Sequence, residues 1–145
     1  MRADLKPALV LGGSGTVGQE VVRSLRAAGA PTTFTFFRGE ERAEALASET
    51  GASAVQLDLT DPAAARIVLQ GLSVAPKILV HCAAVAATAP LAEITDAAWS
   101  DAQAINCQAV LLGCQTLLAG LSEGESGEVV VLGGMDRTQS LPVPI

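Results

Sequence analysis

A glycine-rich stretch near the N-terminus constrains this chain more than any other feature. Gly12, Gly15 and Gly18 lie between an apolar run at 8–11 and an amphipathic stretch at 17–28. This pattern predicts a strand, a tight turn and a helix. Glycine allows dihedrals and close approaches that a Cβ prevents, and a helix N-terminus attracts anions. We therefore expect the turn to bind the pyrophosphate of a dinucleotide, the alternative being an ordinary glycine-containing turn.

Each position of the turn has an expected role. Gly12 makes the turn itself, Gly15 lets the backbone approach the phosphates, and Gly18 lets helix and strand pack closely. Ser14 and Thr16 add hydroxyl groups that can donate hydrogen bonds.

Composition limits the partners that this chain can have. The sequence has 145 residues, enough for one domain, and half of them are hydrophobic, with a mean hydropathy of +0.42. No segment holds 18 uninterrupted apolar residues, and the first six residues lack the apolar core of a signal peptide. We therefore expect a cytoplasmic protein that has no membrane partner. The net charge of −6 also disfavours nucleic acid.

Cysteine and histidine usage disfavours a metal site. Cys82, Cys107 and Cys114 are odd in number and lack C-x-x-C spacing, which indicates reduced thiols. His81 is the only histidine, so no Cys/His cluster forms. An imidazole at a strand end can act as an acid or base. For His81 we favour a packed, hydrogen-bonded residue.

The hydrophobic pattern alternates between strands and helices along the whole chain. The expected strands cover 8–11, 32–37, 53–57, 77–81 and 128–132. The expected helices cover 17–28, 40–49, 62–70 and 97–121. This alternation predicts an α/β fold with a doubly wound parallel sheet in the order 3-2-1-4-5. The ligand crevice is expected at the carboxyl ends of the first and fourth strands, where the order reverses.

Burial is also predicted from periodicity. The strand at 128–132 is apolar throughout, which is typical of a strand buried on both faces. The inward face of the first helix is expected to hold Val17, Val21, Val22, Leu25 and Ala28. The expected core residues of the last helix are Trp99, Ile105, Leu111, Leu112 and Leu118.

Arg38 stands where a ribose-binding side chain is expected, at the end of the second strand. A guanidinium there suits a 2′-phosphate, so NADP is favoured over NAD. Glu40 and Glu41 keep NAD possible, and an ordinary solvated arginine is the alternative. Asp58 follows the third strand and can accept a hydrogen bond from an adenine amino group, whereas Asp61 is expected to cap the next helix.

The chain resembles the N-terminal part of the short-chain dehydrogenase/reductase family, most closely the 3-oxoacyl-acyl-carrier-protein reductases. The resemblance covers about residues 7–135. It is carried by VLGGSGTVG at 10–18, LDLTD at 57–61, HCAA at 81–84 and ITDAAWSDAQAINCQAV at 94–110. In the last segment a tryptophan precedes Asn106 by seven residues, as in the family. The resemblance implies a Rossmann-type fold.

The resemblance also implies roles for single residues. Gly12, Ser14, Gly15 and Val17 would line the pyrophosphate. Asp58 and Leu59 would meet the adenine, and Cys82, Ala83 and Ala84 would pack on the ribose side. Asn106 would be the family's catalytic asparagine, holding a water in a proton relay. The alternative for Asn106 is a polar residue that bends the helix and is satisfied by backbone.

Several positions depart from the family pattern. Leu11 replaces the leading threonine, and the spacing is nearer to G-x-x-G-x-x-G of the extended subgroup. HCAA at 81–84 replaces N-N-A-G, and Gly134 stands where the catalytic serine is expected. The chain contains no tyrosine. The family's Tyr-x-x-x-Lys pair would lie beyond Ile145. We therefore expect 1–145 to be a single Rossmann domain, truncated at its C-terminus and lacking the family's C-terminal strands.

Two functions follow from this resemblance. The first is an NAD(P)-dependent oxidoreductase that transfers hydride between NADPH and a carbonyl, alcohol or acyl-carrier substrate. The 145-residue chain alone is then expected to be inactive. The second is a catalytically inactive nucleotide-binding module or synthase subunit. A homo-oligomer formed through the helix at 97–121 is expected in either case.

Overall fold

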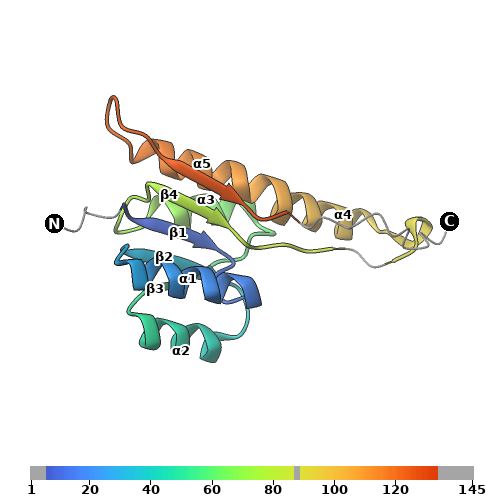
Figure 1. Ribbon diagram of the computed structural model, residues 1–145. Helices are drawn as coiled ribbons and strands as arrows, with labels where there is room; N and C mark the ends of the chain where they lie inside the picture. Colours follow the sequence, from blue (N-terminus) through green and yellow to red (C-terminus); the bar gives the residue numbers. More distant parts are fainter. Residues whose placement is uncertain (1–5, 87–88, 134–145) are drawn as a thin grey trace.

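The computed structural model describes residues 6–86 and 89–133, and its centre is a five-stranded parallel sheet (Figure 1). The strands are β1 (Ala8–Leu11), β2 (Thr32–Phe36), β3 (Ser53–Gln56), β4 (Ile78–His81) and β5 (Glu128–Val131). Their order is β3-β2-β1-β4-β5. Val10 of β1 pairs with Phe34 of β2 on one side and with Val80 of β4 on the other. The predicted α/β fold class and strand order are confirmed.

Helices cover both faces of this sheet. The helical segments are α1 (Thr16–Ala28), α2 (Glu40–Thr50), α3 (Pro62–Gln70), η1 (Leu91–Glu93), α4 (Asp96–Gln103), η2 (Ala104–Gln108) and α5 (Ala109–Ala119). Side chains alternate across a strand, so Val10 packs in the cluster beneath α1 and α2. Leu9 and Leu11 instead pack against α3 and α5. No helix in the described ranges is long and apolar enough to span a bilayer.

The short helices begin and end where their sequences predict. Asp61 caps α3 by accepting hydrogen bonds from the backbone N–H groups of Ala63 and Ala64, at 3.1 and 3.0 Å. Gly29 ends α1 with φ of 96°, a left-handed conformation that glycine adopts without strain.

The long helix predicted at 97–121 is interrupted, which corrects that expectation. A π-helical turn, η2, separates α4 from α5. Such turns insert an extra residue into a helix and are frequent at functional sites. Here the turn contains Asn106, whose side chain bonds to the backbone of Val85 across from the helix. Periodicity does not reveal this turn because the apolar spacing continues through it.

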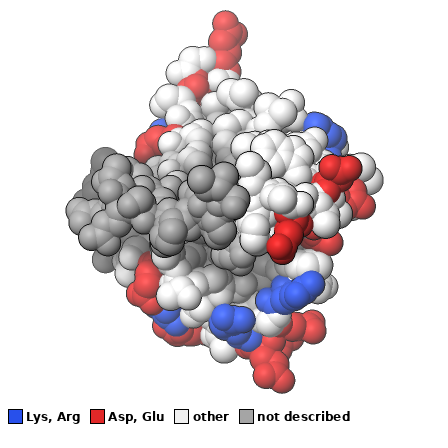
Figure 2. Space-filling view, turned by 90° about the vertical axis from the view of Figure 1, so that its right-hand side faces the viewer, with Lys and Arg blue, Asp and Glu red and all other residues white. Residues whose placement is uncertain are grey.

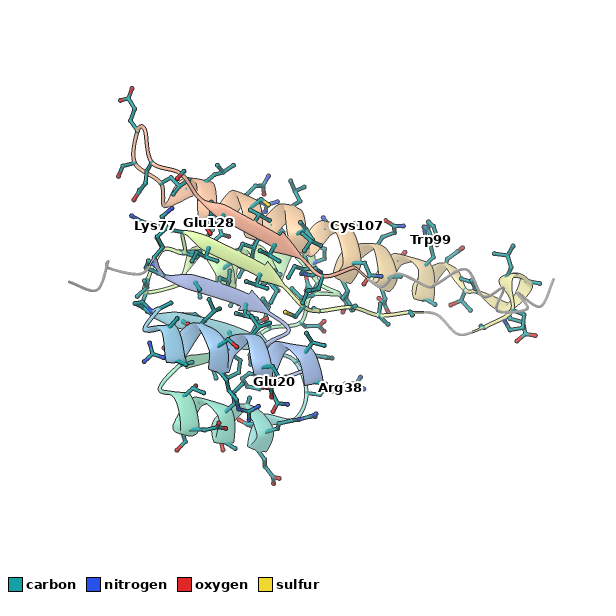
Figure 3. The ribbon with its side chains drawn as sticks, in the orientation of Figure 1. Glu20, Arg38, Lys77, Trp99, Cys107 and Glu128 are labelled. Atoms are coloured by element: carbon teal, nitrogen blue, oxygen red, sulfur yellow. The ribbon has the colours of Figure 1, made fainter. Side chains whose placement is uncertain are left out.

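Several predicted core residues are exposed. Leu112 is buried and Ile105 is partly buried, but Trp99, Leu111 and Leu118 are exposed, as is Val17 of α1. α4 extends beyond the end of the sheet, where Trp99 points away from the strands (Figure 3). β5 is exposed along its whole length because it is the edge strand of the described sheet. The predicted burial of β5 is therefore wrong for these residues.

Adjacent leucines of α5 test this assignment of the core. Leu117 is 3% exposed and Leu118 is 65% exposed. We expect Leu117→Ala to lower the free energy of unfolding by about 2–5 kcal/mol, because it opens a cavity in the core. Leu118→Ala should change it by less than about 0.5 kcal/mol. Urea unfolding of both variants measures the difference. Equal losses would contradict the placement of the two side chains.

Candidate functional site

A cleft of about 490 Å³ lies at the carboxyl ends of β1, β2, β3 and β4. It gathers most of the predicted cofactor-binding residues, namely Gly12, Ser14, Gly15, Arg38, Asp58, Leu59, Cys82, Ala83 and Ala84. This is the sheet edge where the strand order reverses, as the sequence predicts. Thr16, Val17, Gly18 and Asn106 do not line the cleft. A second cavity, of about 210 Å³ between α3 and α5, contains none of the predicted site residues.

The glycine turn packs closely against three other segments. A Cβ on Gly12 would lie 2.7 Å from the backbone of Ala83, after β4. On Gly13 it would lie 2.5 Å from the Cβ of Phe34, in β2. On Gly18 it would lie 2.3 Å from the carbonyl oxygen of Gly12, so this glycine brings α1 against the turn. Side chains at these positions would force the cleft apart.

The N-terminus of α1 opens toward this cleft through Gly15. The helix has no side-chain N-cap and no acidic residue in its first turn. A Cβ on Gly15 would come no nearer than 3.4 Å to a neighbouring atom, so the space above it is open. Uncapped N–H groups and a positive dipole end form a site for an anion.

Arg38 lies at the cleft edge, just after β2. Its guanidinium carbon is 5.2 Å from the centre of the Phe37 ring, a cation–π arrangement. Figure 3 shows the side chain extending away from the sheet. No ion pair within the described residues uses it. The charge is therefore available to an anionic group in the cleft.

The Asp58 carboxylate is already engaged in a local turn. Its Oδ1 accepts hydrogen bonds from the backbone N–H of Thr60 at 2.9 Å and from the Thr60 hydroxyl at 2.7 Å. These bonds orient the carboxylate at the cleft wall. The predicted contact with adenine stays a prediction.

Asn106 connects the π-turn to the loop after β4 through hydrogen bonds. Its Nδ2 donates to the carbonyl oxygen of Val85 at 2.8 Å, and its Oδ1 accepts from the Val85 N–H at 3.0 Å. Both ends of the amide thus bond to backbone, as expected for the alternative in which Asn106 is a polar residue of the helix satisfied by backbone. Its predicted catalytic role stays a prediction. Val85 and Ile105 themselves line the cleft.

His81 is packed as predicted, but the predicted hydrogen bonds are missing. The residue is 1% exposed, and neither ring nitrogen has a hydrogen-bond partner among the described residues. Burial lowers the pKa of the imidazole, and the nearby backbone of Ile105 partly opposes this change. Burial also raises the pKa of the Cys82 thiol. Both groups therefore favour their neutral forms near neutral pH.

Sequence reasoning missed several residues that line the cleft. These are Thr35, Phe36, Phe37, Leu57, Thr60, Val85 and Ile105. Most directly flank predicted site residues, so the rule that strand ends gather at one edge could have found them. Ile105 is different because its position depends on the π-turn.

The sequence profile described as short chain dehydrogenase matches residues 6–143. The chain belongs to this family. Gly134, which is expected at the family's serine position, lies outside the described residues.

Several solved structures resemble the chain closely. BdcA, an E. coli protein solved in complex with NADPH, is 30% identical with a TM-score of 0.82. A blue fluorescent protein from a metagenomic library, also solved with NADPH, is 29% identical with a TM-score of 0.83. A Serratia marcescens short-chain dehydrogenase/reductase mutant is 28% identical with a TM-score of 0.77.

These alignments cover most of this chain and just over half of each relative. They include 92%, 93% and 90% of this chain, but only 54%, 58% and 56% of the respective structures. No curated protein matched significantly.

The buried imidazole of His81 predicts a pH-dependent stability. Because folding lowers its pKa below the ordinary 6.5, the unfolded chain binds more protons on mild acidification. The free energy of unfolding should therefore fall as pH drops from 7 through 6.5, and level off below the folded-state pKa. In His81→Leu this dependence should disappear. Urea unfolding between pH 5 and 7 compares the two, and parallel curves would contradict a neutral buried imidazole.

Proposed function

We propose that this chain is the cofactor-binding part of an NADP-dependent short-chain oxidoreductase. The observation that carries the proposal is the cleft at the strand-order reversal, which joins an uncapped helix N-terminus to Arg38. The same cleft combines apolar walls with a few polar groups, which is typical of cofactor sites. Two of the structural relatives were solved with NADPH.

The residues of the cleft offer a partner for each part of a dinucleotide. The turn at 12–15 and the start of α1 would hold the pyrophosphate. Arg38 would bind the 2′-phosphate, and Asp58 with Leu59 would border the adenine. Cys82, Ala83 and Ala84 would pack against the ribose, toward Val85. When bound, NADPH supplies the hydride that reduces a carbonyl.

Local geometry must hold this anionic cofactor because the protein itself is acidic. Figure 2 shows the face toward which the strands end; outside its grey residues, acidic groups lie near the margins and Lys or Arg groups lie in the lower right part. A net charge of −6 gives no general attraction for phosphates. The glycine turn and Arg38 therefore have to supply the binding energy.

Reversing the charge of Arg38 tests the choice of NADP. Arg38→Asp should raise the dissociation constant of NADPH about tenfold or more, because it removes a charge-assisted contact with the 2′-phosphate. The constant for NADH should change little or fall. Fluorescence titration measures both. Arg66→Asp is the matched control, since Arg66 lines the other cavity. An unchanged preference would reject the assignment of Arg38 to the 2′-phosphate.

A second candidate function is nucleotide binding without turnover, in a synthase subunit or sensor. The replacement of the family's serine by Gly134, which the resemblance implies, favours it for this sequence. The discriminating measurement is NADPH consumption with carbonyl or acyl-carrier substrates. Binding without consumption favours the module, and consumption by the 145-residue chain excludes it. A folded chain that binds neither NADPH nor NADH would contradict both functions.

Two broader expectations accompany this proposal. Apolar surface is exposed along α4 and α5 at Trp99, Leu111 and Leu118. This surface supports homo-oligomerisation through these two helices. Light scattering that gives a monomer mass would contradict it. We also propose a cytoplasmic location and a small-molecule substrate. Microscopy of a tagged protein tests the location.

A further inference from the structure

We propose that Thr35 is a positioning residue that holds the glycine turn in its cofactor-binding geometry. The inference rests on the proposed function, because it assigns a purpose to a residue of the same cleft. Thr35 lies in β2, 23 positions from the turn that it contacts. No part of the glycine pattern itself points to it.

Thr35 bonds to the turn through both its side chain and its backbone. Its Oγ1 accepts a hydrogen bond from the N–H of Gly12 at 3.0 Å. Its carbonyl oxygen accepts another from the N–H of Gly13 at 2.9 Å. The residue is 1% exposed, although it also lines the cleft. Two successive amides of the turn are thus held by one residue.

The register of the sheet explains why Thr35 can accept hydrogen bonds from the glycine turn. The last pair between β1 and β2 is Val10 with Phe34. β2 continues for two more residues, so Thr35 lies opposite Leu11, the last residue of β1, beside the start of the turn. On its other side Thr35 pairs with Val55 of β3. β3 therefore fixes the backbone of Thr35, and Thr35 in turn fixes the glycine turn.

The hydroxyl matters because of the conformation of Gly12. This residue has φ of 78° and approaches the backbone of Ala83, so the space for rearrangement is small. An unpartnered N–H at this place would pull the turn toward another acceptor or water. Such a shift displaces the backbone N–H groups that would bind the pyrophosphate. We therefore expect loss of the hydroxyl to weaken cofactor binding more than the fold.

Thr35→Val removes the acceptor and keeps the shape of the side chain, whereas Thr35→Ser restores the hydroxyl. Thr32→Val is the matched control. Thr32 lies in the same strand, is 6% exposed, and donates its hydroxyl hydrogen to the carbonyl of Ala30 at 2.9 Å, away from the cleft. Each variant of the full chain is titrated with NADPH and with adenosine 2′-monophosphate, which lacks the pyrophosphate. Urea unfolding measures stability in parallel.

Thr35→Val should raise the dissociation constant of NADPH about tenfold, and Thr35→Ser should restore it to within about threefold of the wild type. The constant for adenosine 2′-monophosphate should stay unchanged. Thr32→Val should lose stability like Thr35→Val but bind NADPH as the wild type does. Equal NADPH binding by Thr35→Val and the wild type would overturn the proposal. So would equal weakening in both valine variants.

Amide exchange in the nucleotide-free protein separates failure of this inference from failure of the proposed function. The Gly12 N–H should exchange faster in Thr35→Val and at the wild-type rate in Thr32→Val. If the wild type binds neither NADPH nor NADP, the proposed function and the cofactor role of Thr35 both fail. Faster exchange would then show only that Thr35 holds the turn. If the Gly12 N–H exchanges at the same rate in Thr35→Val and in the wild type, the hydrogen bond between Gly12 and Thr35 does not hold the turn, and the inference fails.

Discussion

Close packing around the glycine turn is the constraint on which the rest of this structure depends. The turn contacts β2 at Gly13, the loop after β4 at Gly12, and α1 at Gly18, each at a distance that excludes a Cβ. These contacts join the two halves of the sheet at the point where the strand order reverses. They also place the N-terminus of α1 over the cleft. The positions of the neighbouring site residues follow from this packing, because each of them lies at the end of a strand near the glycine turn.

The π-turn η2 is the second fixed point of the cleft. Asn106 bonds to both backbone groups of Val85, and these bonds connect η2 to the loop that follows β4. His81, the last residue of β4, lies beneath the same turn beside the backbone of Ile105. A buried imidazole without hydrogen-bond partners is costly for a folded protein. The His81 side chain instead fills space between β4 and η2, where it is 1% exposed.

The sequence predicted the sheet well because its determinants are local. Strand 8–11 and the glycines after it have a strong pattern, and Asp61 with Pro62 marks a helix start in only two residues. Burial of the last helix and strand was predicted poorly, because exposure depends on which elements lie beside them. Leu118 has helical spacing like a core residue, yet no described element covers it. Thr35 and Ile105 were missed because a hydrogen bond between strands and a π-turn leave no periodic signal.

The cleft and the edge strand β5 belong to different parts of the chain. Among the residues that the structure describes, those that line the cleft lie between Gly12 and Ile105, and β5 contributes none of them. The described part of the cleft is therefore formed by β1 to β4, the loops that follow them, and η2. Exposed apolar side chains lie along β5, α4 and α5, and also at Phe37 and Val85 in the cleft. Because β5 contributes no described residue to the cleft, a failure to turn over substrate would not argue against cofactor binding there.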